Sequence, residues 1–151
     1  MIFLTSCSDD CENIKNSFSC PFKAEITERQ TGTAFSAEFE ESGCLFRFSK
    51  PDALKDVVLK GKENDFRLIY EKLDRECKLS YFRPVSAFYK AVSEFQKEDF
   101  KPECSKGICS YTVDGTEISV YYRESGNIIS RITTEEDGQR FVFDIAASRK
   151  K

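Results

Sequence analysis

The sequence predicts a mainly β protein of the α+β class, in which one helix packs on the apolar face of a curved antiparallel sheet of about ten strands. Three observations support this prediction. Apolar and polar residues alternate with a period of two through most of the chain, as in strands with one buried face. One segment in mid-chain has the helical period instead. Turn signals such as Ser42-Gly43 and Asp137-Gly138 separate the alternating stretches.

The expected helix covers residues 84–97. Its apolar residues recur at spacings of three and four, which places them on one stripe: Val85, Phe88, Tyr89, Val92 and Phe95. Pro84 suits the first helical turn, where its missing N–H costs nothing. A single amphipathic helix among strands must bury this stripe, and the apolar face of the sheet is the only large surface that can accept it.

Six strands are expected before the helix and four after it. The early strands are expected at residues 22–29, 35–40, 44–49, 56–60, 66–71 and 77–81. An irregular loop over residues 99–107 is expected to lead to the late strands, at residues 111–113, 118–123, 128–132 and 141–145. Asp114-Gly115 is a strong signal for a hairpin turn between two of them.

Composition excludes several classes of function. The 151 residues suit one domain, and the net charge of −3 with both signs mixed argues against a nucleic-acid surface. The absence of histidine excludes Ser-His and Cys-His nucleophilic pairs and histidine-containing zinc sites. Glu40 and Glu41 are adjacent, so in a strand they point to opposite faces and do not form a hydrolase pair. We therefore expect no enzymatic activity, no cofactor and no metal.

The first residues resemble the lipobox of bacterial lipoproteins. Leu4-Thr5-Ser6-Cys7 has an aliphatic residue, two small ones and then the cysteine that such proteins acylate. A basic region and most of an apolar region are missing in front of it. The alternative is an ordinary apolar start that precedes a cysteine. We expect residues 1–20 to be a truncated signal and polar tether, residues 21–147 the domain and residues 148–151 a basic tail, with lipidation at Cys7.

Six cysteines remain if Cys7 carries a lipid: Cys11, Cys20, Cys44, Cys77, Cys104 and Cys109. An even number outside the membrane suggests disulfides, and six cysteines allow 15 connectivities.

The leading expectation among these pairings is a local bridge between Cys104 and Cys109, because Lys106-Gly107 can reverse the chain between them. A competing arrangement links one of these two cysteines to Cys77. Cys44 and Cys77 fall on inward strand positions and are alternatively buried thiols. A metal site is the weakest reading, since the spacing from Cys104 to Cys109 does not suit a zinc knuckle.

The order strands, helix, strands resembles the LolA/LppX-like lipoprotein-carrier family over roughly residues 18–145. Three stretches carry the resemblance: 17–24, like the opening strand, 45–51, like a third strand that ends in proline, and 83–85, which opens the helix. The resemblance implies a strongly curved sheet that forms an unclosed barrel. The sequence departs from the family pattern in one respect. The family usually has a helix before the first strand, and the segment of residues 8–19 is too short and too polar to form a good one.

The resemblance also implies a concave apolar face that holds a lipid or acyl chain. The alternation assigns these residues to that face, together with the helix stripe: Phe35, Phe39, Phe46, Phe48, Leu68, Tyr70, Leu79, Phe88, Val92, Val120, Tyr122, Phe141 and Phe143. The same residues would equally pack on the helix and on one another, since any half-buried sheet has an apolar face.

Two functions follow from this organisation. The first is a lipid-anchored protein on the extracytoplasmic face of a bacterial membrane that binds a lipid or other apolar ligand in the concave face. The second is a lipoprotein scaffold that regulates a cell-envelope or germination enzyme, through an edge strand for example, and binds no small molecule. An empty apolar cleft of several hundred Å³ would favour the first function, and a filled core would favour the second.

Overall fold

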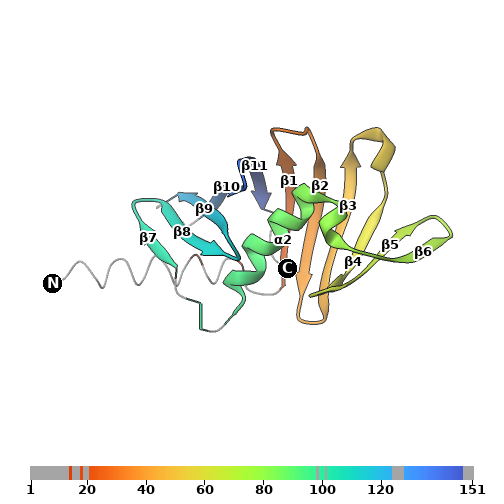
Figure 1. The fold of residues 1–151 in the computed structure, drawn as a ribbon, viewed down its shortest axis with the longest axis horizontal. Coiled ribbons are helices and arrows are strands. Elements are labelled where there is room, and N and C mark those ends of the chain that lie inside the picture. Colours follow the sequence, from red (N-terminus) through yellow and green to blue (C-terminus); the bar gives the residue numbers. More distant parts are fainter. Residues whose placement is uncertain are drawn as a thin grey trace.

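The computed structural model describes Ile14, Phe18 and residues 21–97, 99–100, 102–123 and 128–147. These residues form one 11-stranded antiparallel sheet, and the helix α2 (Arg83–Phe95) lies in front of it (Figure 1). The first half of the sheet consists of β1 (Phe22–Glu28), β2 (Ala34–Glu40), β3 (Gly43–Lys50), β4 (Val58–Lys62), β5 (Asp65–Tyr70) and β6 (Leu73–Cys77). The second half consists of β7 (Glu103–Ser105), β8 (Ile108–Val113), β9 (Thr116–Arg123), β10 (Ile128–Glu136) and β11 (Gln139–Ala147).

The strand order explains why a helix crosses the sheet. Neighbouring strands follow the order β6-β5-β4-β3-β2-β1-β11-β10-β9-β8-β7, so the first and last strands meet in the middle. The strands β6 and β7 are therefore the two edges, and they do not pair with each other. Because α2 connects these edges in the chain, it must traverse one face of the sheet (Figure 1). This arrangement confirms the expected mainly β fold with an unclosed sheet and one covering helix.

Three connections in the second half of the sheet are two-residue turns. Lys106-Gly107, Asp114-Gly115 and Asp137-Gly138 all have positive φ at both residues. This is the conformation of the type I′ turn, whose twist matches the twist of the flanking strands. The hairpin signal at Asp114-Gly115 is thereby confirmed.

Two strand predictions are wrong in their limits. The sixth strand covers Leu73–Cys77 and not residues 77–81, because Leu79–Tyr81 form a 3₁₀ turn, η2, that leads into α2. The expected irregular loop over residues 99–107 contains a strand, β7. Both differences have one cause: the pairing partner, and not the apolar alternation, decides where these short and polar strands run.

A buried carboxylate closes the turn between β1 and β2. Glu28 is fully buried and accepts hydrogen bonds from the backbone N–H of Gln30, Thr31 and Val142 at 2.7–2.9 Å. The Thr31 hydroxyl donates a further bond to the same carboxylate. Since Val142 belongs to β11, Glu28 ties the turn to the central pairing of β1 with β11.

The hydrophobic core lies between α2 and the sheet and contains most of the phenylalanines. It also contains Ile14 and Phe18, both fully buried. The Phe18 ring lies 4.7 Å from that of Phe95 and 5.3 Å from that of Phe22.

Candidate functional site

The concave face is closed by the helix. Most of the residues predicted to line this face are buried, with exposed fractions of 9% or less. The buried residues are Phe35, Phe39, Phe46, Phe48, Leu79, Phe88, Val92, Val120, Tyr122, Phe141 and Phe143. The two exceptions are Leu68, which is half-buried, and Tyr70, which is 40% exposed. Both lie on β5.

Phe88 is the centre of this packing. Its ring lies 5.6 Å from the rings of both Phe35 and Phe143, and 6.4 Å from that of Phe39. It therefore joins β2 and β11 beneath the helix, the two strands on either side of the central strand β1. Rings at these separations and tilts attract one another in addition to burying apolar area. The middle of the concave face is consequently a filled core.

Tyr89 seals the side of the helix that faces β4 and β5. Its ring packs at 6.0 Å from Phe39 and 5.4 Å from Phe66, and its hydroxyl accepts a hydrogen bond from the Glu63 N–H at 2.9 Å. Burial raises the pKa of Tyr89, and the hydrogen bond from Glu63 opposes this rise in part. The residue was predicted only as part of the apolar stripe, so the bond that fixes its polar end was not foreseen.

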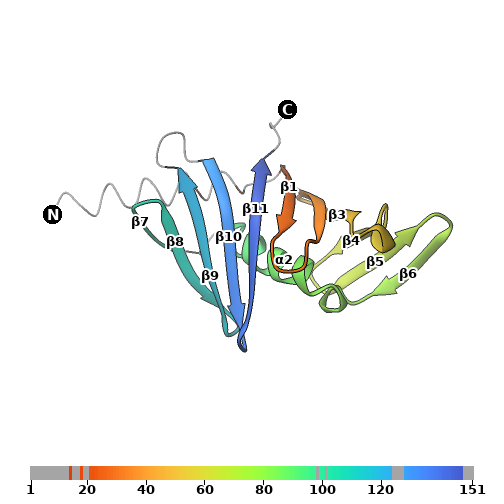
Figure 2. The ribbon, with the colours of Figure 1, turned by 90° about the horizontal axis from the view of Figure 1, so that it is seen from above.

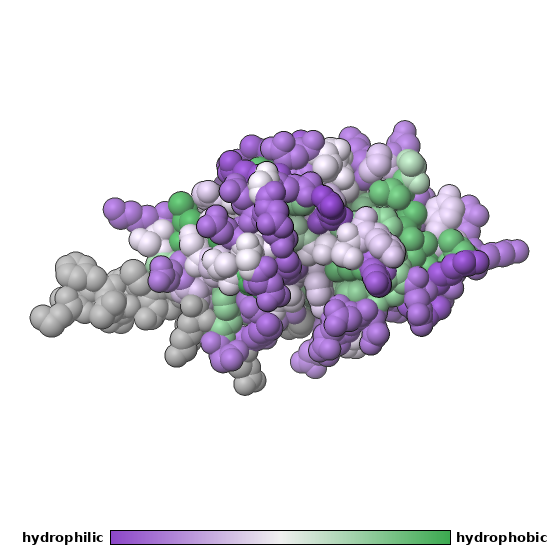
Figure 3. All heavy atoms as spheres, viewed as in Figure 1, coloured by the Kyte–Doolittle hydropathy of each residue, from purple (hydrophilic) through white to green (hydrophobic). Residues whose placement is uncertain are grey.

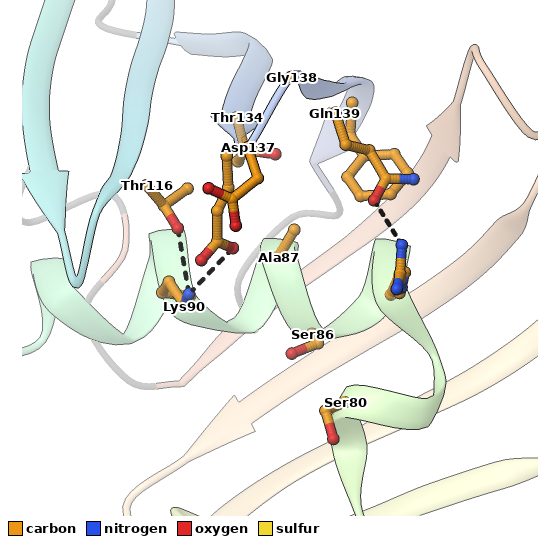
Figure 4. Close-up of a pocket in the computed structure, with 12 residues that line it drawn as sticks. Ser80, Ser86, Ala87, Lys90, Thr116, Thr134, Asp137, Gly138 and Gln139 are labelled. Atoms are coloured by element: carbon orange, nitrogen blue, oxygen red, sulfur yellow. Dashed lines mark hydrogen bonds and ion pairs between the residues drawn. The ribbon is translucent and has the colours of Figure 1, made fainter.

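One large cleft of the protein is polar. It measures about 780 Å³ and lies between α2 and the tip of the β10–β11 hairpin (Figure 4). Lys90 donates to the Thr116 hydroxyl at 3.1 Å and pairs with Glu136 at 3.6 Å, while Arg83 donates to the Gln139 side chain at 2.9 Å. These bonds tie the helix to the second half of the sheet. Charged and hydroxyl side chains dominate the lining of this cleft, so the cleft is not an acyl-chain site.

A second cleft of about 620 Å³ runs over the outer face of α2. Its apolar lining residues are Phe66, Leu79, Tyr89 and Val113. Lysines and carboxylates from the helix and from two turns make up much of the remaining lining. Neither cleft reaches the fully buried rings beneath the helix.

The β5–β6 hairpin is the part of the concave side that α2 leaves open. In both ribbon views this hairpin projects beyond the helix (Figure 1 and Figure 2). The space-filling view has apolar surface next to it, to the right of α2 (Figure 3). Leu73 is 43% exposed and pairs across the hairpin with Tyr70, and Tyr81 in the adjoining η2 turn is 72% exposed. We call the concave side of β5 and β6 the open wing.

At the opposite end of the sheet, a disulfide joins the last two strands. Cys104 and Cys109 form a disulfide across β7 and β8, where they pair directly in the strand register. The predicted local bridge is confirmed, and the competing link to Cys77 is wrong. Cys77 is a half-buried free thiol whose pKa is raised by burial, and Cys44 is buried.

Cys7 lies outside the described residues, so its lipidation stays a prediction. Across the described ranges no helix is long and apolar enough to cross a membrane. The same residues contain no cluster of three or more His, Cys, Asp or Glu side chains that could hold a metal ion.

Comparison with known proteins identifies the fold. No protein-family model matches the sequence, and no curated protein matches it. An uncharacterized conserved protein from Thermus thermophilus aligns over 97% of this chain and 88% of its own, with a TM-score of 0.56 and 10% identity. A LolA superfamily protein from Nitrosomonas europaea aligns over 96% of this chain and 94% of its own, with a TM-score of 0.52 and 10% identity. The chain has a LolA-like fold.

The LolA-like fold agrees with the resemblance inferred from the sequence. The lipoprotein LppX from Mycobacterium tuberculosis also aligns, over 95% of this chain and 97% of its own, with a TM-score of 0.46 and 8% identity. At such identities a structural likeness establishes the fold and not the activity.

Proposed function

We propose that this protein is a lipid-anchored scaffold on the extracytoplasmic face of a bacterial membrane, which binds and regulates an enzyme of the cell envelope or of germination. The observation that carries the proposal is the filled concave face. Phe35, Phe46 and Phe88 are fully buried beneath α2, so aromatic side chains occupy the face where a carrier would hold an acyl chain. The LolA-like fold then serves as a rigid support for a binding surface.

The exposed apolar residues support a protein partner. Tyr70, Leu73 and Tyr81 are the large hydrophobic side chains exposed around the open wing. Tyrosine is enriched at the energetic centres of protein interfaces, where its ring is buried and its hydroxyl finds a polar partner. The wing also ends in an edge strand, β6, whose outer side offers backbone groups to another chain.

A lipid ligand is the second candidate, favoured by the cleft of about 620 Å³ over α2. Its apolar part, around Phe66 and Leu79, is continuous with the open wing, because Phe66 and Leu68 lie on the same face of β5. An acyl chain could lie along this surface without entering the core. The lysines and carboxylates in the same lining weigh against this use.

Native mass spectrometry of the protein purified from its own membrane separates the two candidates. We expect a complex with a second protein and no stoichiometric lipid beyond the acyl groups on Cys7. A stable one-to-one complex with a free lipid, and no protein partner, would overturn the proposal. Cys7→Ala should leave the partner binding of the domain intact and shift the protein out of the membrane fraction, which tests the anchor separately.

A further inference from the structure

The two edges of the sheet differ in their capacity to accept another strand. β7 contains three residues and is tied to β8 by the disulfide between Cys104 and Cys109. β6 contains five residues, and all of them are exposed except Cys77, which is half-buried. An unpaired edge is a template for strand addition, in which backbone hydrogen bonds supply affinity and alternate side chains supply specificity. β6 is the edge with the length for this mode of binding.

The backbone groups that β6 offers follow from its register. Tyr70 pairs with Leu73 on either side of a two-residue turn, and Leu68 pairs with Arg75 further along. The pair that flanks such a turn is hydrogen-bonded, and hydrogen-bonded and open pairs alternate from there. The N–H and C=O groups of Asp74 and Glu76 therefore point away from β5, toward the open edge.

The side chains of β6 separate by charge between the two faces. Leu73, Arg75 and Cys77 continue the concave side, because they pair with Tyr70, Leu68 and Phe66. Asp74 and Glu76 lie on the convex side, where Asp74 accepts a hydrogen bond from Arg67 at 2.6 Å.

A strand added to β6 would place one residue opposite each of these positions, where opposite charges attract and like charges repel. On its concave side, the added strand would have an apolar residue opposite Leu73, an acidic residue opposite Arg75 and an apolar residue opposite Cys77. Its convex side would match Asp74 and Glu76 with cations.

The same charges disfavour a second copy of this chain as the added strand. When β6 pairs antiparallel with itself over all five residues, Arg75 faces Arg75 and Asp74 faces Glu76. Every charged position then meets a like charge, which destabilises the pairing. The sequence of β6 thus protects the edge from self-association and leaves it open to a strand of complementary charge.

We propose that β6 binds, by antiparallel strand addition, an extended segment of another envelope protein with the pattern apolar, cationic, acidic, cationic, apolar. This inference rests on the proposed scaffold function and names its surface. The exposed side chains of Tyr70 and Leu73 extend the apolar contact beyond the added strand. The acidic residue of the segment pairs with Arg75, and its cations pair with Asp74 and Glu76.

The test uses two peptides and nuclear magnetic resonance of the whole domain. The probe is the peptide Thr-Val-Lys-Glu-Lys-Val-Thr, and its matched control is the charge-reversed peptide Thr-Val-Glu-Lys-Glu-Val-Thr. We expect amide shifts at Asp74 and Glu76 with the first peptide. Three charge pairs reverse in the second, so we expect binding weaker by about tenfold or more. Equal affinity for both peptides, no binding at millimolar concentration, or shifts outside β5 and β6 would overturn the proposal.

Three variants sharpen the test. Glu76→Pro removes an outward N–H without touching the bonds to β5 and should abolish binding, while an unchanged spectrum elsewhere confirms the fold. Arg75→Glu should weaken binding of the first peptide by several fold. Lys60→Glu makes the same charge change on the inner strand β4 and should have no effect. Shifts of the β6 amides that grow with protein concentration in the absence of peptide would instead indicate self-pairing and contradict the proposal.

Failure of this inference is distinguishable from failure of the proposed function. If Glu76→Pro retains the protein partner in membranes as the wild type does, the scaffold function stands and its assignment to β6 is wrong. If the wild type retains no protein partner, the scaffold function itself is wrong.

Discussion

The two ends of the sheet are built from similar alternating strands, yet one is covered and the other is open. At the β7–β8 end, the Tyr111 ring lies 5.2 Å from Phe95, and its hydroxyl donates to the Ala91 carbonyl of the helix at 2.7 Å. At the β5–β6 end, Tyr70 and Leu73 remain 40% and 43% exposed. The alternation of apolar residues is therefore not sufficient to predict burial in this protein.

The length of the helix accounts for the difference. A helix of 13 residues is about 20 Å long, whereas eleven strands laid side by side span about 48 Å. Curvature of the sheet narrows this gap but does not remove it. α2 lies over the middle of the sheet and leaves the β5–β6 hairpin beyond its first turn (Figure 1). One end of the apolar face thus becomes core, and the other becomes a surface available for binding.

The largest effect is expected beneath the helix. Phe88→Ala removes a fully buried ring with three aromatic neighbours and should lower the free energy of unfolding by about 3–5 kcal/mol. Tyr70→Ala, on the open wing, is the control and should cost less than about 1 kcal/mol. Urea unfolding measures both. A similar cost for the two variants would contradict the contrast between core and wing.

The disulfide should matter next. Replacing Cys104 and Cys109 together by alanine should cost about 2 kcal/mol, the chain-entropy value for a short loop. Hydrogen exchange should accelerate in β7 and β8 and stay unchanged in β5 and β6, because the two hairpins lie at opposite edges. Cys77→Ala is the matched control at the other edge. Faster exchange at both edges would mean that the bridge stabilises the whole sheet.

Tyr111 gives a smaller effect with a defined pH dependence. Tyr111→Phe removes the bond to the Ala91 carbonyl and should cost about 1 kcal/mol at neutral pH. Burial, and next the Glu94 charge, hold the pKa of Tyr111 well above its ordinary value.

The folded state therefore favours the protonated phenol. The stabilisation of the folded state by Tyr111 is complete below the tyrosine pKa of the unfolded chain, about 10, and declines as the pH rises above that value. The variant should lose this decline, whereas Tyr81→Phe at an exposed site should keep it.

The smallest effect is expected at the seam between β1 and β11. Arg29 donates two hydrogen bonds to Asp144. These bonds lower the pKa of Asp144, and the positive charges of Arg29 and Arg131 lower it further. A lowered carboxyl pKa contributes stability that is present above the unfolded pKa and is lost as the pH falls through the folded one. Asp144→Asn should slightly lower the urea midpoint at pH 7 and not at pH 2. A large loss at pH 7 would show that this exposed pair does more than surface pairs usually do.

Much of the fold could be predicted from the sequence because local signals were strong. The stripe from Val85 to Phe95 fixed the helix, and Asp114-Gly115 fixed a hairpin. The Cys104–Cys109 bridge followed from the reversal at Lys106-Gly107. The limits of β6 and the presence of β7 did not follow, because both strands are short and owe their extent to a neighbouring strand.

The candidate site was less predictable, since burial depends on where the helix lies. The alternation assigned Phe35 and Tyr70 to the same concave face, but only Phe35 is covered. The contacts of Lys90 with Thr116 and Glu136 join residues far apart in the sequence, and no local pattern indicates them. The charge separation on β6 was visible in the sequence only once its pairing with β5 was known.

Hydrogen exchange of α2 in the presence of oleate tests the central claim, that the helix keeps the concave face closed. The amides of Ser86 to Phe95 should exchange only through global unfolding, at rates that oleate does not change. The amides of the β5–β6 hairpin should exchange faster and report any surface binding of the fatty acid. If oleate instead accelerates exchange in α2 while the free energy of global unfolding is unchanged, the helix lifts to admit a lipid and the protein is a carrier.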